Sequence, residues 1–305
     1  MGNVLPSWND GDCRERILNS IDSMANDPNS STFVPQEKRI AVFDNDGTLW
    51  CEKPGPVQLF FLVSRWKQMA SADPSKRNIQ PYKAAFENDI RYFADLYSHV
   101  PDLIAAVGAS FSGITVEDFE KEVRLFLSAA NHPRFKTALS NLSYKPMREL
   151  IDFLKENGFS VYITTGGGRD FVRSVSQNVY GLSKANVIGS SVVINYEGGH
   201  LVRSSDLRPP LDDGEGKPIH IFEYIGYPPV FAAGNADGDT QMLETARFSI
   251  LLNHDDADRE YSYSDGAEKV SKVAQKNGWQ IVSMKNDFTQ IFDLDAKRIP
   301  SPIPV

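Results

Sequence analysis

The stretch Ile40–Trp50, IAVFDNDGTLW, decides how the rest of the chain is interpreted. Its apolar start, with Arg39 before it, predicts a short buried strand over residues 39–43. Asp44 and Asp46 follow directly, and two such carboxylates repel each other unless a cation or a proton intervenes. The stretch therefore predicts a strand whose carboxyl end carries a charged site.

Downstream of residue 143, strands and helices alternate. The segments FSVYITT, PVFAAG, FSILLN and WQIVSM predict buried strands, and helical patterns such as KPMRELIDFLKENG lie between them. The stretch NVIGSSVVINYEGGHLVRS predicts a further strand and a hairpin that turns at 197–199. Such alternation is typical of an α/β fold with a doubly wound, mostly parallel sheet.

Residues 52–142 interrupt this alternation just after its first strand. Three helical segments are expected there, PVQLFFLVSRWKQMA, PYKAAFENDIRYFADLY and GITVEDFEKEVRLFLSAA, and no clear strand. An insertion of this length is too long for a connection. We therefore expect two domains, an α/β core formed by residues 1–51 and 143–305 and a helical cap formed by residues 52–142.

Composition narrows the function classes. The 305 residues carry a net charge of −8, which makes the chain a poor candidate for binding nucleic acid. No apolar run is long enough for a membrane helix, and Cys13 and Cys51 form neither a disulfide framework nor a zinc motif. Without a visible signal peptide the expected location is cytoplasmic, with periplasmic or exported as the alternative if a signal was trimmed. The oligomeric state stays open.

Polar residues follow three of the predicted strands. Asp44–Thr48 follow the first, Thr165–Gly168 the second, and Asn235–Asp239 the strand PVFAAG. In parallel α/β sheets, ligands bind outside the carboxyl ends of the strands, so these residues should converge. Oxygen ligands without Cys or His favour Mg²⁺, which prefers one or two carboxylates together with a substrate phosphate. The pattern thus points to phosphoryl transfer on a small phosphorylated metabolite.

The motifs DNDGT, TGGG and GNADGD, in this order, resemble those of the haloacid dehalogenase (HAD) superfamily of phosphohydrolases. The Thr-Gly-Gly pattern, the hairpin and the helical insertion look most like its phosphoserine phosphatase-like branch. The resemblance covers the chain from Arg39 to the strand at 279–284, with the cap matched only in position and helical character. It implies a HAD-like Rossmannoid core, a Mg²⁺ cofactor and an aspartyl-phosphate intermediate.

The resemblance implies a role for each matching residue. Asp44 would be the nucleophile and a metal ligand, and Asp46 the general acid and base that also ligates the metal through its backbone carbonyl. The phosphate would be bound by Thr165, Gly166 and Gly167.

The third motif departs from the family pattern. Asn235 stands where most relatives place a metal-ligating aspartate, so it brings an amide oxygen without a charge. We expect Asn235 to ligate the metal directly and Asp239 to act as an indirect or water-mediated ligand. Asp237 is the reserve candidate.

Two further site residues rest on position alone. Lys217 opens a helix and is favoured over Lys184 as the lysine that the resemblance requires beside the phosphate. Glu52 lies where the chain enters the cap, near the place at which phosphoserine phosphatases read the substrate ammonium group, so a substrate contact is expected there.

The expected activity is a Mg²⁺-dependent phosphomonoesterase acting on a small organic phosphate. A phosphotransferase or mutase would use the same two aspartates and is the first alternative. A non-catalytic protein that binds a phosphate ligand is the second, although such proteins typically lose one of these aspartates.

Overall fold

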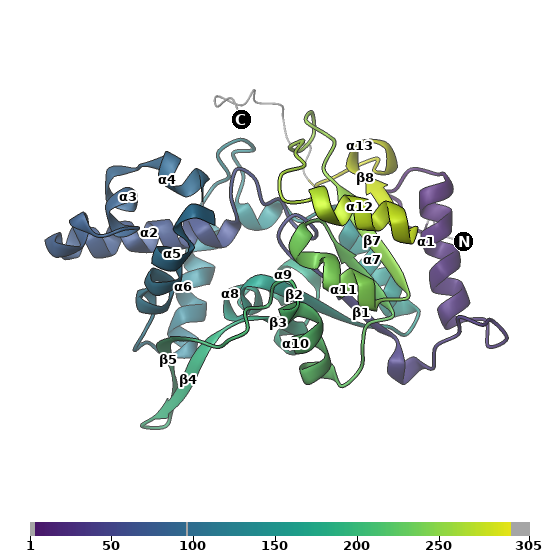
Figure 1. Cartoon of the computed structure of the whole chain (residues 1–305), viewed down its shortest axis with the longest axis horizontal. Coiled ribbons are helices and arrows are strands. Elements are labelled where there is room, and N and C mark those ends of the chain that lie inside the picture. The colour runs from purple at the N-terminus through teal and green to yellow at the C-terminus, as the bar shows by residue number, and fades with distance from the viewer. Residues whose placement is uncertain (1–3, 96, 294–305) are drawn as a thin grey trace.

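The central sheet of the computed structural model, which describes residues 4–95 and 97–293, has six parallel strands within that part of the chain. Their order across the sheet is β3-β2-β1-β6-β7-β8 (Figure 1). The strands are β1 (Ile40–Phe43), β2 (Ser160–Gly168), β3 (Val187–Ser190), β6 (Phe231–Gly234), β7 (Phe248–Asn253) and β8 (Gln280–Ser283). The sheet confirms the predicted doubly wound α/β fold.

The strand order reverses at β1. Ile40 of β1 pairs with Ser160 of β2 on one side, and Ala41 pairs with Phe231 of β6 on the other. The chain adds β2 and β3 outward on the first side and then crosses back to add β6, β7 and β8 on the second. The carboxyl ends of β1, β2 and β6 therefore lie side by side at the switch point, where α/β sheets bind ligands.

Helices cover both faces of the sheet because its strands are apolar on both faces. Ile40 and Val42 pack in one cluster with residues of α10, α11 and α12, while Ala41 and Phe43 belong to a larger cluster that includes residues of α1 and α7. A strand alternates its side chains between faces, so these two sets mark the two layers. The helices are α1 (Asp12–Ala25), α7 (Lys145–Glu156), α10 (Gly216–Ile225), α11 (Thr240–Thr245), α12 (Glu268–Asn277) and, after β8, α13 (Met284–Asp287).

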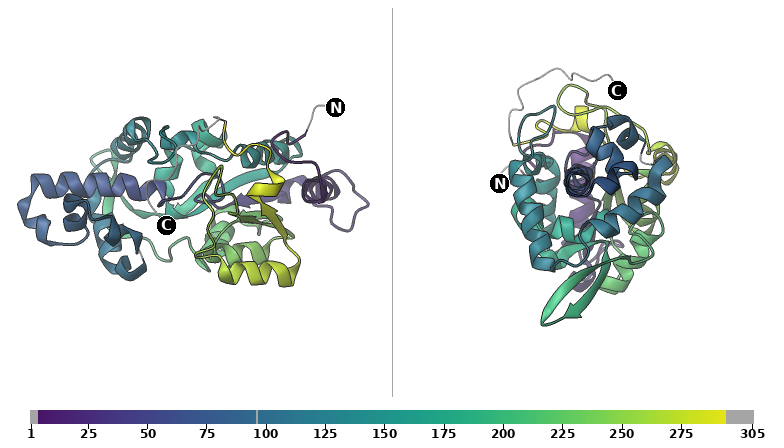
Figure 2. Two further views of the ribbon diagram at one scale, coloured as in Figure 1. Left: turned by 90° about the horizontal axis from the view of Figure 1, so that it is seen from above. Right: turned by 90° about the vertical axis from the view of Figure 1, so that its left-hand side faces the viewer.

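A helical block stands to one side of the sheet (Figures 1 and 2). It contains α2 (Val57–Ala72), α3 (Tyr82–Glu87), α4 (Ile90–Ala94), α5 (Val100–Ser110) and α6 (Val116–Ala129). The second helix predicted from the sequence is broken in two, because Asn88 adopts a left-handed conformation with φ of 57°. Thr115 caps α6 because its hydroxyl oxygen accepts the backbone N–H of Asp118. The division into core and cap at residues 52 and 142 remains a prediction.

The hairpin β4 (Val192–Glu197) and β5 (His200–Leu207) lies against this helical block, away from the main sheet (Figure 2). Arg203 donates its backbone N–H to Ile114 at 2.9 Å and accepts from Gly113 at 2.8 Å. A β-carbon at Gly108 of α5 would lie 2.0 Å from the carbonyl oxygen of Ser205. The hairpin therefore packs as part of the helical block, although the sequence places it inside the core.

Two local predictions need correction. The sequence GGG after the strand FSVYITT favours a turn, but it continues β2 through an irregularity in the pairing with β3 between Thr165 and Gly168. The pattern RDFVRSVSQNVYG predicts one helix, but the structure has two short ones, α8 (Arg169–Arg173) and α9 (Ser176–Tyr180), because Val175 leaves the helical conformation with φ of −130°. Cys13 and Cys51 are free thiols. Among the described residues, no helix combines the length and apolar character needed to cross a membrane.

Candidate active site

A lysine held between two aspartates marks the switch point of the sheet. The ammonium nitrogen of Lys217, in the first turn of α10, lies 2.5 Å from Asp44 Oδ1 and 2.7 Å from Asp239 Oδ1. It also donates to the carbonyl of Thr164 at 3.3 Å, and only 1% of its surface is exposed. Lys184, the alternative, is exposed and pairs with Glu120 of α6. The structure thus brings Lys217, and not Lys184, to the predicted site.

In this buried group, the carboxylates around Lys217 carry more negative charge than its single positive charge can offset. Burial raises the pKa of Asp44 well above its usual range, the charge of Asp239 adds to the rise, and Lys217 opposes it. Burial alone would lower the pKa of Lys217, but Asp239 and Asp44 together raise it, so the ammonium stays charged. Asp212 is a further buried carboxylate, missed by the sequence analysis, whose charge also acts on Lys217.

Asp46 follows Asp44 on the same loop and has a different environment. Its Oδ1 accepts a hydrogen bond of 2.8 Å from the indole N–H of Trp50. Burial raises the pKa of Asp46 to about 6; the Trp50 bond opposes this rise and the charge of Glu52 adds to it. A carboxyl group with such a pKa can both give and take a proton near neutral pH.

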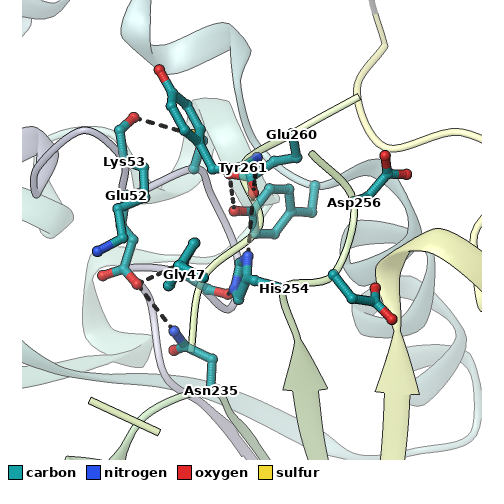
Figure 3. Close-up of polar contacts among 12 residues, drawn as sticks. Gly47, Glu52, Lys53, Asn235, His254, Asp256, Glu260 and Tyr261 are labelled. Atoms are coloured by element: carbon teal, nitrogen blue, oxygen red, sulfur yellow. Dashed lines mark hydrogen bonds and ion pairs between the residues drawn. The ribbon is translucent and has the colours of Figure 1, made fainter. Parts of the chain in front are cut away.

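Three side chains hold the loop 44–48 in place, and two of them come from distant parts of the chain. Besides Trp50, Tyr180 donates its hydroxyl to Asn45 Oδ1 at 2.9 Å. His254, in the loop after β7, lies with Nε2 2.7 Å from the carbonyl oxygen of Gly47 (Figure 3). A carbonyl only accepts, so this ring nitrogen carries a proton. His254 therefore positions the loop through Gly47.

Behind His254 lies a fully buried carboxylate. Glu260 Oε2 is 3.3 Å from His254 Nδ1 and accepts the N–H of Tyr261 at 2.6 Å, and Oε1 accepts the hydroxyl of Tyr144 at 3.1 Å (Figure 3). The sequence analysis missed this group, because neither Tyr144 nor Glu260 lies beside a motif.

The Gly-rich end of β2 lies beside Asp46. The hydroxyl oxygen of Thr165 accepts the N–H of Gly167 at 3.1 Å, and a β-carbon at Gly167 would lie 3.7 Å from Asp46 Oδ2. Gln58 of α2 reaches across from the helical block, and its Oε1 accepts the N–H of Gly168 at 2.6 Å. Gln58 is a site residue that sequence reasoning missed. Its only signal was a polar position within the apolar start of PVQLFF.

The loop after β6 is braced by Asp239. Its Oδ2 accepts the backbone N–H groups of Asn235 and Ala236 at 2.9 and 3.0 Å, while Oδ1 faces Lys217. Asp237 lies elsewhere, because its Oδ1 accepts the N–H groups of Lys269 and Val270 at the start of α12. Asn235 and Asp239 are thus brought to the site, and Asp237 is turned toward a helix end.

Glu52 also lies at the site. Its Oε1 accepts the side-chain N–H of Asn235 at 3.2 Å and the hydroxyl of Tyr263 at 2.7 Å (Figure 3). The ring of Tyr263 stacks on His254 with 4.3 Å between ring centroids. Glu52 is therefore bound to core residues, and its expected contact with substrate stays a prediction.

The donors at this crevice suit a hard cation. Among the described residues, no cluster of three or more His, Cys, Asp or Glu side chains is arranged to hold a metal ion. The predicted donors are oxygens of mixed kinds instead: the resemblance implies the Asp44 carboxylate, the backbone carbonyl of Asp46 and the side-chain amide of Asn235. Oxygen donors with excess negative charge fit Mg²⁺ better than Zn²⁺, which more often takes nitrogen and sulfur ligands.

Gly47 is where the loop, Asn235 and Glu52 meet. Its φ is 78°, and a β-carbon there would lie 2.2 Å from Asn235 Nδ2 and 2.7 Å from Glu52 Oε1. We expect Gly47→Ala to displace both side chains and to lower kcat/KM by about 100-fold, since a displacement near 1 Å costs that much. Steady-state hydrolysis of an aryl phosphate measures this effect.

Gly113 provides the matched control. Its φ is 80°, nearly that of Gly47, but a β-carbon there would have no atom within 4 Å. Both alanine variants carry the cost of the left-handed backbone, about 1–2 kcal/mol. Gly113→Ala should keep its activity. Equal loss in both variants would mean that backbone conformation, and not the contact with Asn235 and Glu52, explains the effect.

Comparisons with known proteins identify the family of the chain. The family model for haloacid dehalogenase-like hydrolases matches residues 41–244, which include all three strand-end motifs. No curated protein matches the sequence.

Solved structures show the same fold. The chain is similar to a conserved functionally unknown protein from Anaerococcus prevotii DSM 20548, with 14% identity, a TM-score of 0.58 and coverage of 93% of this chain and 94% of that one. A protein with unknown function from Bordetella pertussis Tohama I matches at 14% identity and a TM-score of 0.51, over 80% of this chain and 98% of that one. The chain belongs to the haloacid dehalogenase-like hydrolases, the family that its three strand-end motifs predicted.

Proposed function

We propose that the protein is a Mg²⁺-dependent phosphomonoesterase that hydrolyses small organic phosphates through a phosphorylated Asp44. The observation that carries the proposal is the chain of ion pairs from Asp44 through Lys217 to Asp239, with Asp46 beside the Gly-rich end of β2. A buried nucleophile, a fixed positive charge and backbone N–H groups at one point are the requirements of phosphoryl transfer.

The residues divide the reaction between them. An oxygen of Asp44 forms a bond to phosphorus while the bond from phosphorus to the ester oxygen breaks, and Asp46 gives its proton to the departing oxygen. A water molecule then attacks the phosphorylated Asp44, Asp46 takes the proton of this water, and inorganic phosphate and free Asp44 result. Lys217 and the hydroxyl of Thr165 hold the phosphoryl oxygens, with the backbone of Gly166 and Gly167 beside them. When bound, Mg²⁺ would neutralise charge on the phosphate, held by Asp44, the Asp46 carbonyl and Asn235.

Removal of the metal tests this proposal. Phosphate release from an aryl phosphate should stop when a chelator is added and return when excess Mg²⁺ is supplied, since one lysine cannot offset the carboxylates and the phosphate together. A panel of phosphorylated metabolites, including phosphoserine, would then identify the substrate class. Hydrolysis that continues unchanged in chelator contradicts the proposed metal dependence.

A further inference from the structure

The amide that replaces a carboxylate at the end of β6 is held from two sides. Asn235 is buried, its Oδ1 accepts the hydroxyl of Thr48 at 3.0 Å, and its Nδ2 donates to Glu52 Oε1 at 3.2 Å. A hydroxyl can give or accept a hydrogen bond, but an ionised carboxylate only accepts. Glu52 therefore fixes which end of the amide is nitrogen and leaves the amide oxygen on the side of the loop 44–48.

The position of Glu52 is built into the fold. Its Oε1 also accepts the hydroxyl of Tyr263 at 2.7 Å, so two side chains hold the same carboxylate oxygen. The bare backbone of Gly47 leaves room for both side chains, since a β-carbon there would overlap Asn235 and Glu52 together. Glu52, Asn235 and Gly47 are thus fitted to one another.

Among the described residues, no positively charged side chain forms an ion pair with Glu52. Lys217 is engaged by Asp44 and Asp239, and the ion pairs found among the described residues include none to Glu52. The Glu52 side chain is only partly buried, and a divalent cation bound beside Asn235 would lie close to its carboxylate. The Glu52 carboxylate therefore adds a third negative charge near the predicted metal donors, although the end of β6 supplies the uncharged amide of Asn235.

We propose that Glu52 carries the third carboxylate charge of the divalent-cation site, moved from the strand end to the segment that enters the helical block, and orients Asn235 as an oxygen ligand. Glu52 is a positioning residue that acts through Asn235. This inference rests on the proposed Mg²⁺-dependent function, and it differs from the substrate contact expected for Glu52 from the family resemblance.

A charge exchange between the two residues tests the inference without substrate. Mn²⁺ binding followed by electron paramagnetic resonance, and Mg²⁺ binding by competition, should weaken about 10- to 100-fold in Glu52→Gln, as for other residues that orient a metal ligand. Asn235→Asp places two carboxylates in contact and should lower the thermal midpoint of the metal-free protein. The double variant Glu52→Gln with Asn235→Asp restores the charge and the hydrogen bond, so both quantities should return close to wild type.

Tyr263→Phe is the matched control, because it removes the second hydrogen bond to Glu52 without changing charge and should weaken Mn²⁺ binding less than Glu52→Gln. Should Glu52→Gln fail to fold, a double variant that folds and binds Mn²⁺ still supports the exchange. Wild-type Mn²⁺ affinity in a folded Glu52→Gln, with only a higher KM, overturns the inference and favours the substrate contact. A wild-type protein that binds no divalent cation overturns the proposed function as well.

Discussion

Asp44→Asn is expected to abolish phosphate release while the protein stays folded. Asparagine has the shape of the aspartate but cannot form the bond to phosphorus, so kcat should fall by about 10⁴-fold or more. The Asn side-chain oxygen can still accept from Lys217, which lies 2.5 Å from Asp44. Since burial and Asp239 raise the pKa of Asp44, the fold disfavours its charge, and the neutral side chain should leave the free energy of unfolding unchanged or higher.

Asp46→Asn is the comparison for this variant. It removes the proton donor but keeps the nucleophile, so it should slow alkyl phosphates much more than aryl phosphates, whose leaving oxygens need less help from an acid. Hydrolysis that persists in Asp44→Asn, with the phosphate released by the same site, would refute the covalent mechanism. Urea unfolding of both variants gives the stability measurement.

Lys217→Ala is expected to lose both activity and stability. The lysine is buried and holds two carboxylates, so its removal leaves uncompensated charges inside the protein, at a cost of about 3–5 kcal/mol. Turnover should also fall by about 10²- to 10³-fold, because a fixed positive charge at the transferring phosphoryl group is lost. The contrast with Asp44→Asn, which loses activity without stability, separates the two roles.

Lys184→Ala is the control for the lysine. Lys184 is exposed and pairs with Glu120 at the surface, where an ion pair contributes at most about 1 kcal/mol, so activity and stability should stay near wild type. The assignment of Lys217 fails if its alanine variant keeps near-normal turnover while Lys184→Ala loses it.

The strand ends could be predicted from the sequence because each is a local pattern. The motif DNDGT follows an apolar run, and the sheet order then brings Asp44, Thr165 and Asn235 to one edge. Lys217 lacks a motif, yet its place at the start of a helix was enough to favour it over Lys184. The fold therefore follows from periodicity and topology, and the charged centre of the site from these together with the resemblance of the three motifs to the family.

The side chains that contact the site loops from other helices and loops could not be predicted in this way. Gln58 and Tyr180 reach the loops only because helices distant in the chain fold over them. Glu52 and Asn235 are 183 residues apart, and no sequence pattern at either position indicates their contact. Such pairs depend on how the helical block meets the core, which no local pattern encodes.

The contacts of the hairpin β4–β5 with α5 and α6 join segments that are synthesised at different times. Residues 100–129 leave the ribosome long before residues 192–207, yet the loop at Gly113 and Ile114 pairs with Arg203 in the finished protein. A nascent helical block therefore stays uncovered on this side until about two thirds of the chain has been made, because its last contacts are distant in sequence. The hairpin that follows later in the chain thus completes the helical block. A fragment that stopped at residue 142 would lack this hairpin, against which α5 and α6 pack.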